Sequence, residues 1–116
     1  SMRRMSFALT TEQFRARRKT VTRRFGWAFA VPGMRVVGVE KAMGFRRGEK
    51  GPPPIHVIEF TNCQWERVDA VTDADVALEG FPGQNAAWFV EHLCRHAGKR
   101  PDDLVNRLAF RYVEDA

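Results

Sequence analysis

Residues 55–68, "IHVIEFTNCQWERV", limit the fold of this chain more than any other segment. In an extended chain Ile55 and Val57 share one face, and Ile58 and Phe60 share the other. This alternation, in a run with several β-branched and aromatic residues, predicts a long strand. Because an isolated strand is not stable in water, the chain must contain a sheet that includes this segment.

Two more segments predict strands. "MRVVGVEKAM" at 34–43 follows "VPGM" at 31–34, whose proline and glycine suit a type II turn. "LVNRLAFRYV" at 104–113 is the other predicted strand. The glycines and prolines of "GFRRGEKGPPP" at 44–54 predict an irregular hairpin loop.

Three segments predict short helices. The first covers residues 11–18, and Thr72 is the expected cap of the second, "DADVALE". Asn85 opens the third, "AAWFVEHLCRHA", whose apolar residues recur at helical spacing. The order of helix, strands, two helices and strand predicts an α+β domain, in which a curved, mostly antiparallel sheet or barrel is flanked by helices.

The length of 116 residues suits one domain. No apolar run approaches the roughly 20 residues of a membrane span, and no signal peptide is recognisable. Cys63 and Cys94 are far apart and have no CxxC spacing, so we expect reduced thiols and a cytoplasmic protein. We interpret Ser1, which precedes Met2, as a remnant of cloning.

The positive charge is concentrated near the N-terminus. The net charge is +5, but residues 1–24 contain eight Lys or Arg and a single acid, Glu12, which gives +7. The other residues therefore carry −2 in total. An anionic partner would be attracted to the first segment, and nucleic acid is the obvious candidate.

Within that segment, "RRKTVTRR" at 17–24 allows two interpretations. It can be a solvated basic surface, or it can place Lys19 beside the hydroxyl of Thr22 in a reactive site. A lysine activates a hydroxyl only when its pKa is lowered by burial or by neighbouring cations. The two side chains point to opposite faces of a strand, so they converge only if the chain turns between them.

Other residues have simple structural interpretations beside functional ones. Glu79 lies near a predicted helix C-terminus, where the helix dipole disfavours an acid, which hints that another group holds it, although spacing alone favours a surface glutamate. His92 and His96 are one helical turn apart, but no third ligand is evident, and we predict no metal site. We expect His56 to be a satisfied histidine of the sheet. Trp27 belongs either to the core or to a surface on which bases stack.

Together these segments resemble the ASCH domain, a PUA-like β-barrel family. The resemblance rests on "RRKTVTRR" after a helix start, on "PGMRV", "VTDADVALEGF" and "RLAFRYV", and it covers nearly the whole chain in order. The family motif GxKxxExR matches Lys19 and Arg24, whereas Arg17 replaces its glycine and Thr22 its glutamate. Lys-x-x-Thr is the form seen in small ASCH proteins that hydrolyse N4-acetylcytidine.

The resemblance implies a PUA-like α+β fold, a small and mostly antiparallel β-barrel flanked by short helices, over residues 5–116, with 1–4 as a tail. It also implies a catalytic set of Lys19, Thr22 and Glu79 that acts on RNA or a modified nucleoside without metal or cofactor. Thr22, or a water that it positions, would attack the acetyl carbonyl, and Glu79 would relay protons. Arg24 is the candidate cation for the oxyanion.

Two classes of function therefore stay open. The first is an amidohydrolase of N4-acetylcytidine. The second is a module that binds RNA or other nucleic acid without catalysis, through a basic surface that includes Arg17, Arg18 and Arg23, with Trp27 as a stacking residue. A third possibility, an accessory protein that acts through a protein partner, is tested by no feature of the sequence.

Overall fold

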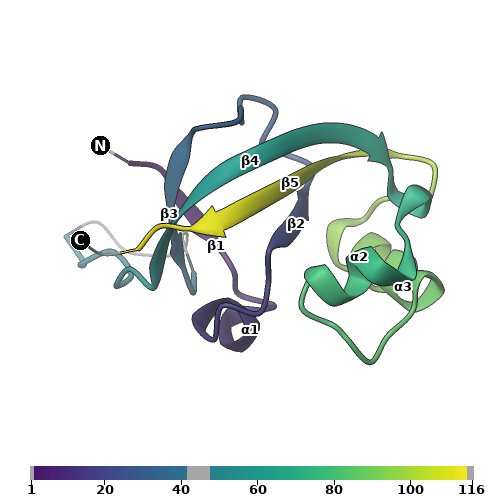
Figure 1. Cartoon of the computed structure of the whole chain (residues 1–116), viewed down its shortest axis with the longest axis horizontal. Coiled ribbons are helices and arrows are strands. Elements are labelled where there is room, and N and C mark those ends of the chain that lie inside the picture. The colour runs from purple at the N-terminus through teal and green to yellow at the C-terminus, as the bar shows by residue number, and fades with distance from the viewer. Residues whose placement is uncertain (1, 42–47, 115–116) are drawn as a thin grey trace.

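A computed structural model describes residues 2–41 and 48–114 and contains one mixed sheet of five strands in the order β1-β3-β4-β5-β2. The two long strands β4 and β5 form its centre and curve along most of the molecule (Figure 1). The strands are β1 Arg4–Ser6, β2 Val21–Arg24, β3 Arg35–Val39, β4 His56–Arg67 and β5 Leu104–Tyr112.

The sheet is not closed, so the predicted barrel is wrong. β3, β4, β5 and β2 pair antiparallel, and only β1 pairs in parallel, with β3. Closure would require β1 to pair with β2, but these strands are the two opposite edges of the sheet. β2 is therefore an edge strand, with the hydrogen-bonding groups of one side free of the ladder.

The helices lie in two places. α1 (Thr11–Arg15) connects β1 to β2, and Figure 1 shows it apart from the other helices. The one-turn 3₁₀ helix η1 (Val68–Ala70), α2 (Asp73–Leu78) and α3 (Ala86–Ala97) follow β4 and gather at the end of the sheet where β5 begins (Figure 1). None of the helices described is long and apolar enough to cross a membrane.

Two clusters of apolar side chains stabilise this arrangement. The larger one packs the N-terminal segment and α1 against the sheet, and in it the rings of Phe7 and Phe14 stack with centroids 3.8 Å apart. Gly38 of β3 makes this contact possible, because a Cβ there would lie 2.1 Å from the Phe14 ring. The smaller cluster, Val71, Val76 and Phe89, holds α2 against α3. The edge strand β2 lies between the two clusters.

Most predicted elements are confirmed with small changes at their ends. The long strand at 55–68 is β4, the strand at 104–113 is β5, and the helices capped by Thr72 and Asn85 are α2 and α3. The helix predicted for 11–18 ends earlier, at Arg15, and the strand predicted for 34–43 ends at Val39. Residues 42–47, with the first part of the predicted loop, lie outside the described residues.

Candidate active site

The end of α1 turns Lys19 towards the interior. The amide of Arg18 donates to the carbonyl of Gln13 and that of Arg17 to the carbonyl of Phe14, which are the two hydrogen bonds of a Schellman motif. Arg17 occupies the left-handed position of this motif with φ of 60°, where glycine is the usual residue. A glycine at this position of the motif would suit the left-handed backbone conformation. Arg17 adopts the same conformation and retains the turn. β2 begins only at Val21, so Lys19 lies in the turn rather than on the strand.

The end of α2 presents Glu79 in a similar way. Gly80, with φ of 107°, and Phe81 donate to the carbonyls of Ala77 and Val76 in a second Schellman motif. Glu79 is the C-cap residue, and its carbonyl lies at the negative end of the helix, where cations are favoured. Lys19 Nζ donates to this carbonyl at 2.7 Å and to Glu79 Oε1 at 2.8 Å.

Lys19 and Glu79 form an ion pair shielded from bulk water, since each residue is only 3% exposed. Burial lowers the pKa of Lys19 below its usual value, against the opposing effect of Glu79, and the nearby Arg24 and Arg23 lower it further. This lysine holds the acid at the helix end, as the helix dipole hinted, and the surface position that spacing favoured for Glu79 is wrong. The lowered pKa is the condition under which a lysine can exchange protons in catalysis.

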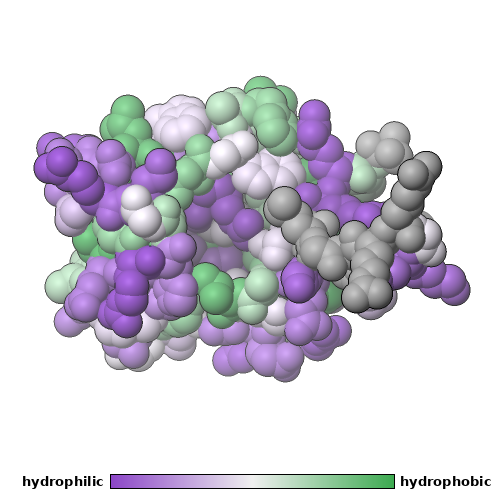
Figure 2. Space-filling view, turned by 180° about the vertical axis from the view of Figure 1, so that it is seen from behind, coloured by the Kyte–Doolittle hydropathy of each residue, from purple (hydrophilic) through white to green (hydrophobic). Residues whose placement is uncertain are grey.

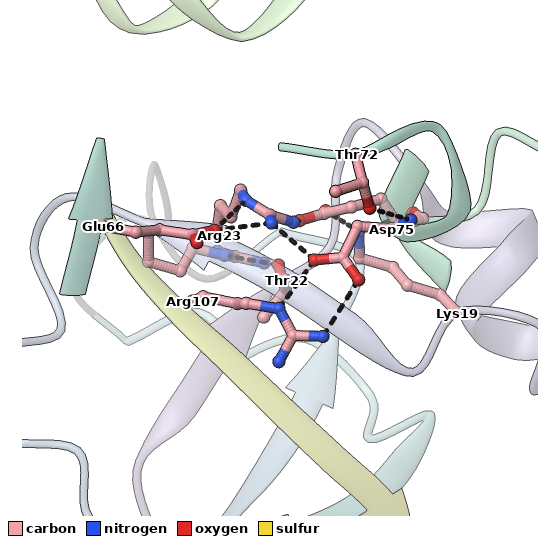
Figure 3. Close-up of polar contacts among 9 residues, drawn as sticks. Lys19, Thr22, Arg23, Glu66, Thr72, Asp75 and Arg107 are labelled. Atoms are coloured by element: carbon pink, nitrogen blue, oxygen red, sulfur yellow. Dashed lines mark hydrogen bonds and ion pairs between the residues drawn. The ribbon is translucent and has the colours of Figure 1, made fainter. Parts of the chain in front are cut away.

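Arg23 holds the second carboxylate oxygen of Glu79. Its Nη1 donates to Glu79 Oε2 at 3.0 Å, and its other nitrogens reach Glu66 of β4 and Asp75 of α2 at 2.6–3.1 Å. Figure 3 shows Asp75 between Arg23 and Arg107. Arg107 donates twice to Asp75 and, with Arg23, lowers the pKa of that carboxyl to about 2. Burial disfavours the charge on Arg23, but its carboxylates outweigh burial and raise its pKa.

Thr22 and Arg24 lie on the other face of β2. Arg24 Nε donates to Thr22 Oγ1 at 3.0 Å, and Nη2 donates to the carbonyl of Ser6 at 2.7 Å. The guanidinium also lies over the ring of Phe7, 4.9 Å from its centroid. Burial lowers the pKa of Arg24 to about 10, so the group remains a cation at neutral pH. The Thr22 hydroxyl accepts this bond and donates none to the described residues, which leaves its proton available.

These residues surround one pocket of about 330 Å³ that extends around the edge of β2. Lys19, Thr22, Arg23, Arg24 and Glu79 all line it. Its walls come from the segment that follows β1 and from α3. They are largely apolar and include Phe7, Leu9, Phe25, Phe81, Phe89 and Leu93. Figure 2, drawn from behind the view of Figure 1, shows a hollow on this side of the molecule with hydrophilic residues inside and hydrophobic residues beside it.

Comparison with solved structures bears on the fold. The crystal structure of the ASCH domain from Lactobacillus crispatus JV V101 is similar, with a TM-score of 0.69 and 18% sequence identity over 97% of this chain and 79% of that one. The chain has an ASCH-like fold. Protein EF3133 from Enterococcus faecalis V583, of family DUF984, has a TM-score of 0.63 and 16% identity over 84% of this chain. The chain spans 63% of the length of EF3133.

The sequence comparisons find no relatives. No family model matches this chain, and no curated protein is significantly similar to it. At such low identities the two crystal structures establish the ASCH-like fold alone.

Three of the predicted substrate-binding residues do not line this pocket. Arg17 and Arg18 are exposed, and Arg17 lies over the ring of Tyr112 at 5.7 Å. Trp27 packs against the larger apolar cluster, with its ring 6.3 Å from that of Phe60. Arg23, expected on a basic surface, is buried among three carboxylates and meets the pocket from inside the fold.

The two histidines of α3 lie at the pocket, a position that the sequence did not indicate. His92 stacks on Trp88 at 4.6 Å, and His92 and His96 both line the pocket. Burial lowers the pKa of His92 below its usual value. No group of three or more potential ligands is arranged for a metal in residues 2–41 and 48–114. His56 is satisfied as expected, because its Nε2 bonds the carbonyl of Arg15 at 2.9 Å.

Proposed function

We propose that the pocket hydrolyses the acetyl amide of N4-acetylcytidine or of a closely related acylated nucleoside. One observation carries the proposal. A buried lysine of lowered pKa, a carboxylate bonded to it and a hydroxyl bonded to an arginine come from two distant parts of the chain and line a single pocket. Such a set of base, acid and nucleophile with a nearby cation suits acyl transfer.

The shape and lining of the pocket suit a nucleoside. Its volume of about 330 Å³ is at the lower end of ligand sites, which range over about 300–1,000 Å³. Aromatic walls can cover a planar base, and the polar groups gather at the edge of β2. The similarity of the fold to an ASCH domain supports a substrate related to nucleic acids.

In the proposed reaction, Thr22 Oγ1 attacks the acetyl carbonyl carbon, and its proton passes through a water in the pocket to neutral Lys19, because no hydrogen bond joins the two side chains directly. Glu79 orients Lys19. Arg24, already bonded to Thr22, stabilises the oxyanion of the tetrahedral intermediate. The bond between the acetyl carbon and N4 then breaks, the proton returns to N4, and cytidine leaves. Water hydrolyses the acetyl-threonine through the same groups and releases acetate, so the net reaction consumes one water.

Turnover of N4-acetylcytidine tests the proposal. We expect the parent protein to release cytidine and acetate, and Thr22→Val to reduce kcat by at least about 10³-fold, because valine keeps the shape and removes the nucleophile. Thr22→Ser, which retains a hydroxyl, should keep measurable turnover. A parent protein without activity, or a Thr22→Val variant as active as the parent, would contradict the assigned reaction.

A second candidate, RNA binding, is favoured by a separate observation. The cations of the N-terminal segment that lie outside the pocket are exposed, and they include Arg15, Arg17 and Arg18. We expect the affinity for a single-stranded RNA to fall steeply with salt, and the double variant Arg17→Glu, Arg18→Glu to bind less tightly and with a smaller salt slope. Glu91→Lys on α3 adds positive charge elsewhere and serves as the control. Binding that is insensitive to salt would exclude this function.

A further inference from the structure

Thr10 has a hydroxyl that the fold does not use. It occupies the N-cap position of α1, where a threonine usually bonds a backbone amide, yet its side chain makes no capping bond. No other described residue bonds the hydroxyl. Thr10 is only 6% exposed, and such a buried hydroxyl normally has a partner.

The Thr10 hydroxyl can be reached from the pocket. Thr10 is one of the lining residues, on the wall formed by the segment after β1. Among the described residues, Asn106 Oδ1 is the sole side-chain nitrogen or oxygen that is fully enclosed without a partner. The Thr10 hydroxyl is therefore open to the pocket, where it can donate a hydrogen bond to a ligand or accept one from it.

The edge of β2 offers a second set of unused polar groups. The amide of Phe110 donates to the carbonyl of Thr20, so this carbonyl points towards β5 as in a hydrogen-bonded pair of the antiparallel ladder, although the amide of Thr20 donates instead to the carbonyl of Leu78. Pairs alternate along such a ladder, so Thr22 and Arg24 also bond to β5, while the main-chain groups of Val21 and Arg23 point outwards.

The main chain of Arg23 reaches the pocket. Arg23 lines the pocket, and its side chain is 1% exposed although the residue as a whole is 4% exposed. The accessible surface of this residue thus lies mainly on its main chain. No residue outside the β2–β5 ladder bonds the amide or carbonyl of Arg23 in the described part of the chain.

We propose that the Thr10 hydroxyl and the outward main chain of Arg23 form the subsite that recognises the polar edge of the base. The amide and carbonyl of one strand residue point the same way, so together they fit a planar group with an acceptor beside a donor. N3 and the N4–H of cytosine, or of its N4-acetyl derivative, are such a pair. Thr10 binds a further polar atom of the ligand. This subsite deepens the proposed function and rests on the pocket assigned there.

The test uses cytidine as a probe, because cytidine is the product and is not consumed. Binding to the parent protein, Thr10→Val and Thr10→Ser is measured by calorimetry, with 3-deazacytidine as the analogue that lacks the N3 acceptor. We expect Thr10→Val to weaken cytidine binding about 10-fold and Thr10→Ser to restore it, because one hydrogen bond to a buried partner is lost and regained. The parent should bind 3-deazacytidine about 10-fold less tightly than cytidine.

Equal binding of cytidine by the parent and Thr10→Val, or equal binding of the two nucleosides by the parent, would overturn the subsite. The reaction is judged separately, from turnover of N4-acetylcytidine. In that assay Thr10→Val should raise KM and leave kcat nearly unchanged, since its contact is made in ground and transition states alike. Cytidine binding that depends on Thr10 without any turnover supports the subsite and rejects the hydrolase. Turnover with an unchanged KM in Thr10→Val supports the hydrolase and rejects the subsite.

Discussion

Glu79→Ala is expected to lower the free energy of unfolding by about 3–5 kcal/mol, the typical cost of removing one partner from a buried ion pair. Glu79 accepts from Lys19 at 2.8 Å and from Arg23 at 3.0 Å, and both cations are nearly inaccessible to water. Without the carboxylate, Lys19 loses the only opposite charge that it contacts among the described residues. Since small domains are stable by about 5–15 kcal/mol, a large share of the total would be lost. Chemical denaturation measures the effect.

Two variants separate charge from other causes. Glu79→Gln keeps the size of the side chain and a carbonyl acceptor, so a loss close to that of Glu79→Ala would assign the effect to charge. Glu91→Ala removes an exposed acid that pairs with Arg95 on α3, and we expect a change of at most about 0.5 kcal/mol. If the free energy of unfolding of Glu79→Ala lies within about 1 kcal/mol of that of the parent protein, the buried pair contributes little to stability.

Lys19→Met is expected to reduce kcat for N4-acetylcytidine by about 10²–10⁴-fold, which is the usual contribution of a general base. Methionine fills a similar volume, and Glu79 keeps its bond to Arg23, so the fold should survive. Lys19→Arg is the informative partner, because arginine keeps the positive charge and cannot lose its proton. Both variants should show this loss if Lys19 exchanges protons. An active Lys19→Arg would restrict Lys19 to an electrostatic role.

The pH dependence provides an independent check on Lys19. Its pKa is lowered by burial, so the neutral amine appears at a pH below the ordinary value of 10.5. Turnover that needs the neutral amine should therefore rise with pH and reach half of its maximum below that value. This rising limb should vanish from the residual activity of Lys19→Met, as followed by kcat from pH 5 to 10. A rate that falls over this range would contradict a lysine base.

The sequence predicted the central part of the fold because that part is encoded locally. Alternation in 55–68 and helical spacing in 86–97 correspond to β4 and α3. β1 has three residues, too few to show a period, and its parallel pairing with β3 depends on a distant segment. β2 was not predicted because its sequence, "VTRR", is mostly polar. Its buried arginine is stabilised by acids that lie elsewhere in the chain. The barrel was wrong because strand pattern does not specify whether the edges of a sheet meet.

The prediction of the candidate site residues depended on the resemblance to the ASCH family more than on the spacing of residues in the sequence. Lys19 and Glu79 are 60 positions apart, and no local sequence pattern predicts their contact. The predicted turn between Lys19 and Thr22 is not what the structure shows: the Schellman turn at Arg17 precedes Lys19, and no hydrogen bond joins the described side chains of Lys19 and Thr22. Arg23 was expected at the surface because charge is read from composition, whereas its burial follows from acids 43–56 positions away. The role proposed for Thr10 could not be predicted from the sequence, since an unused hydroxyl is visible only in three dimensions.

The pairing of β2 with β5 has a consequence for biosynthesis. Residues 21–24 can find their neighbours only after residues 106–109 have been translated, and the whole intervening segment must then close into a loop. Until then the arginines and the lysine beside them stay hydrated, because their acids cannot yet surround them. Nascent chains that lack residues 106–109 would thus lack a formed cavity, and the pocket would appear together with the pairing of β5 with β2.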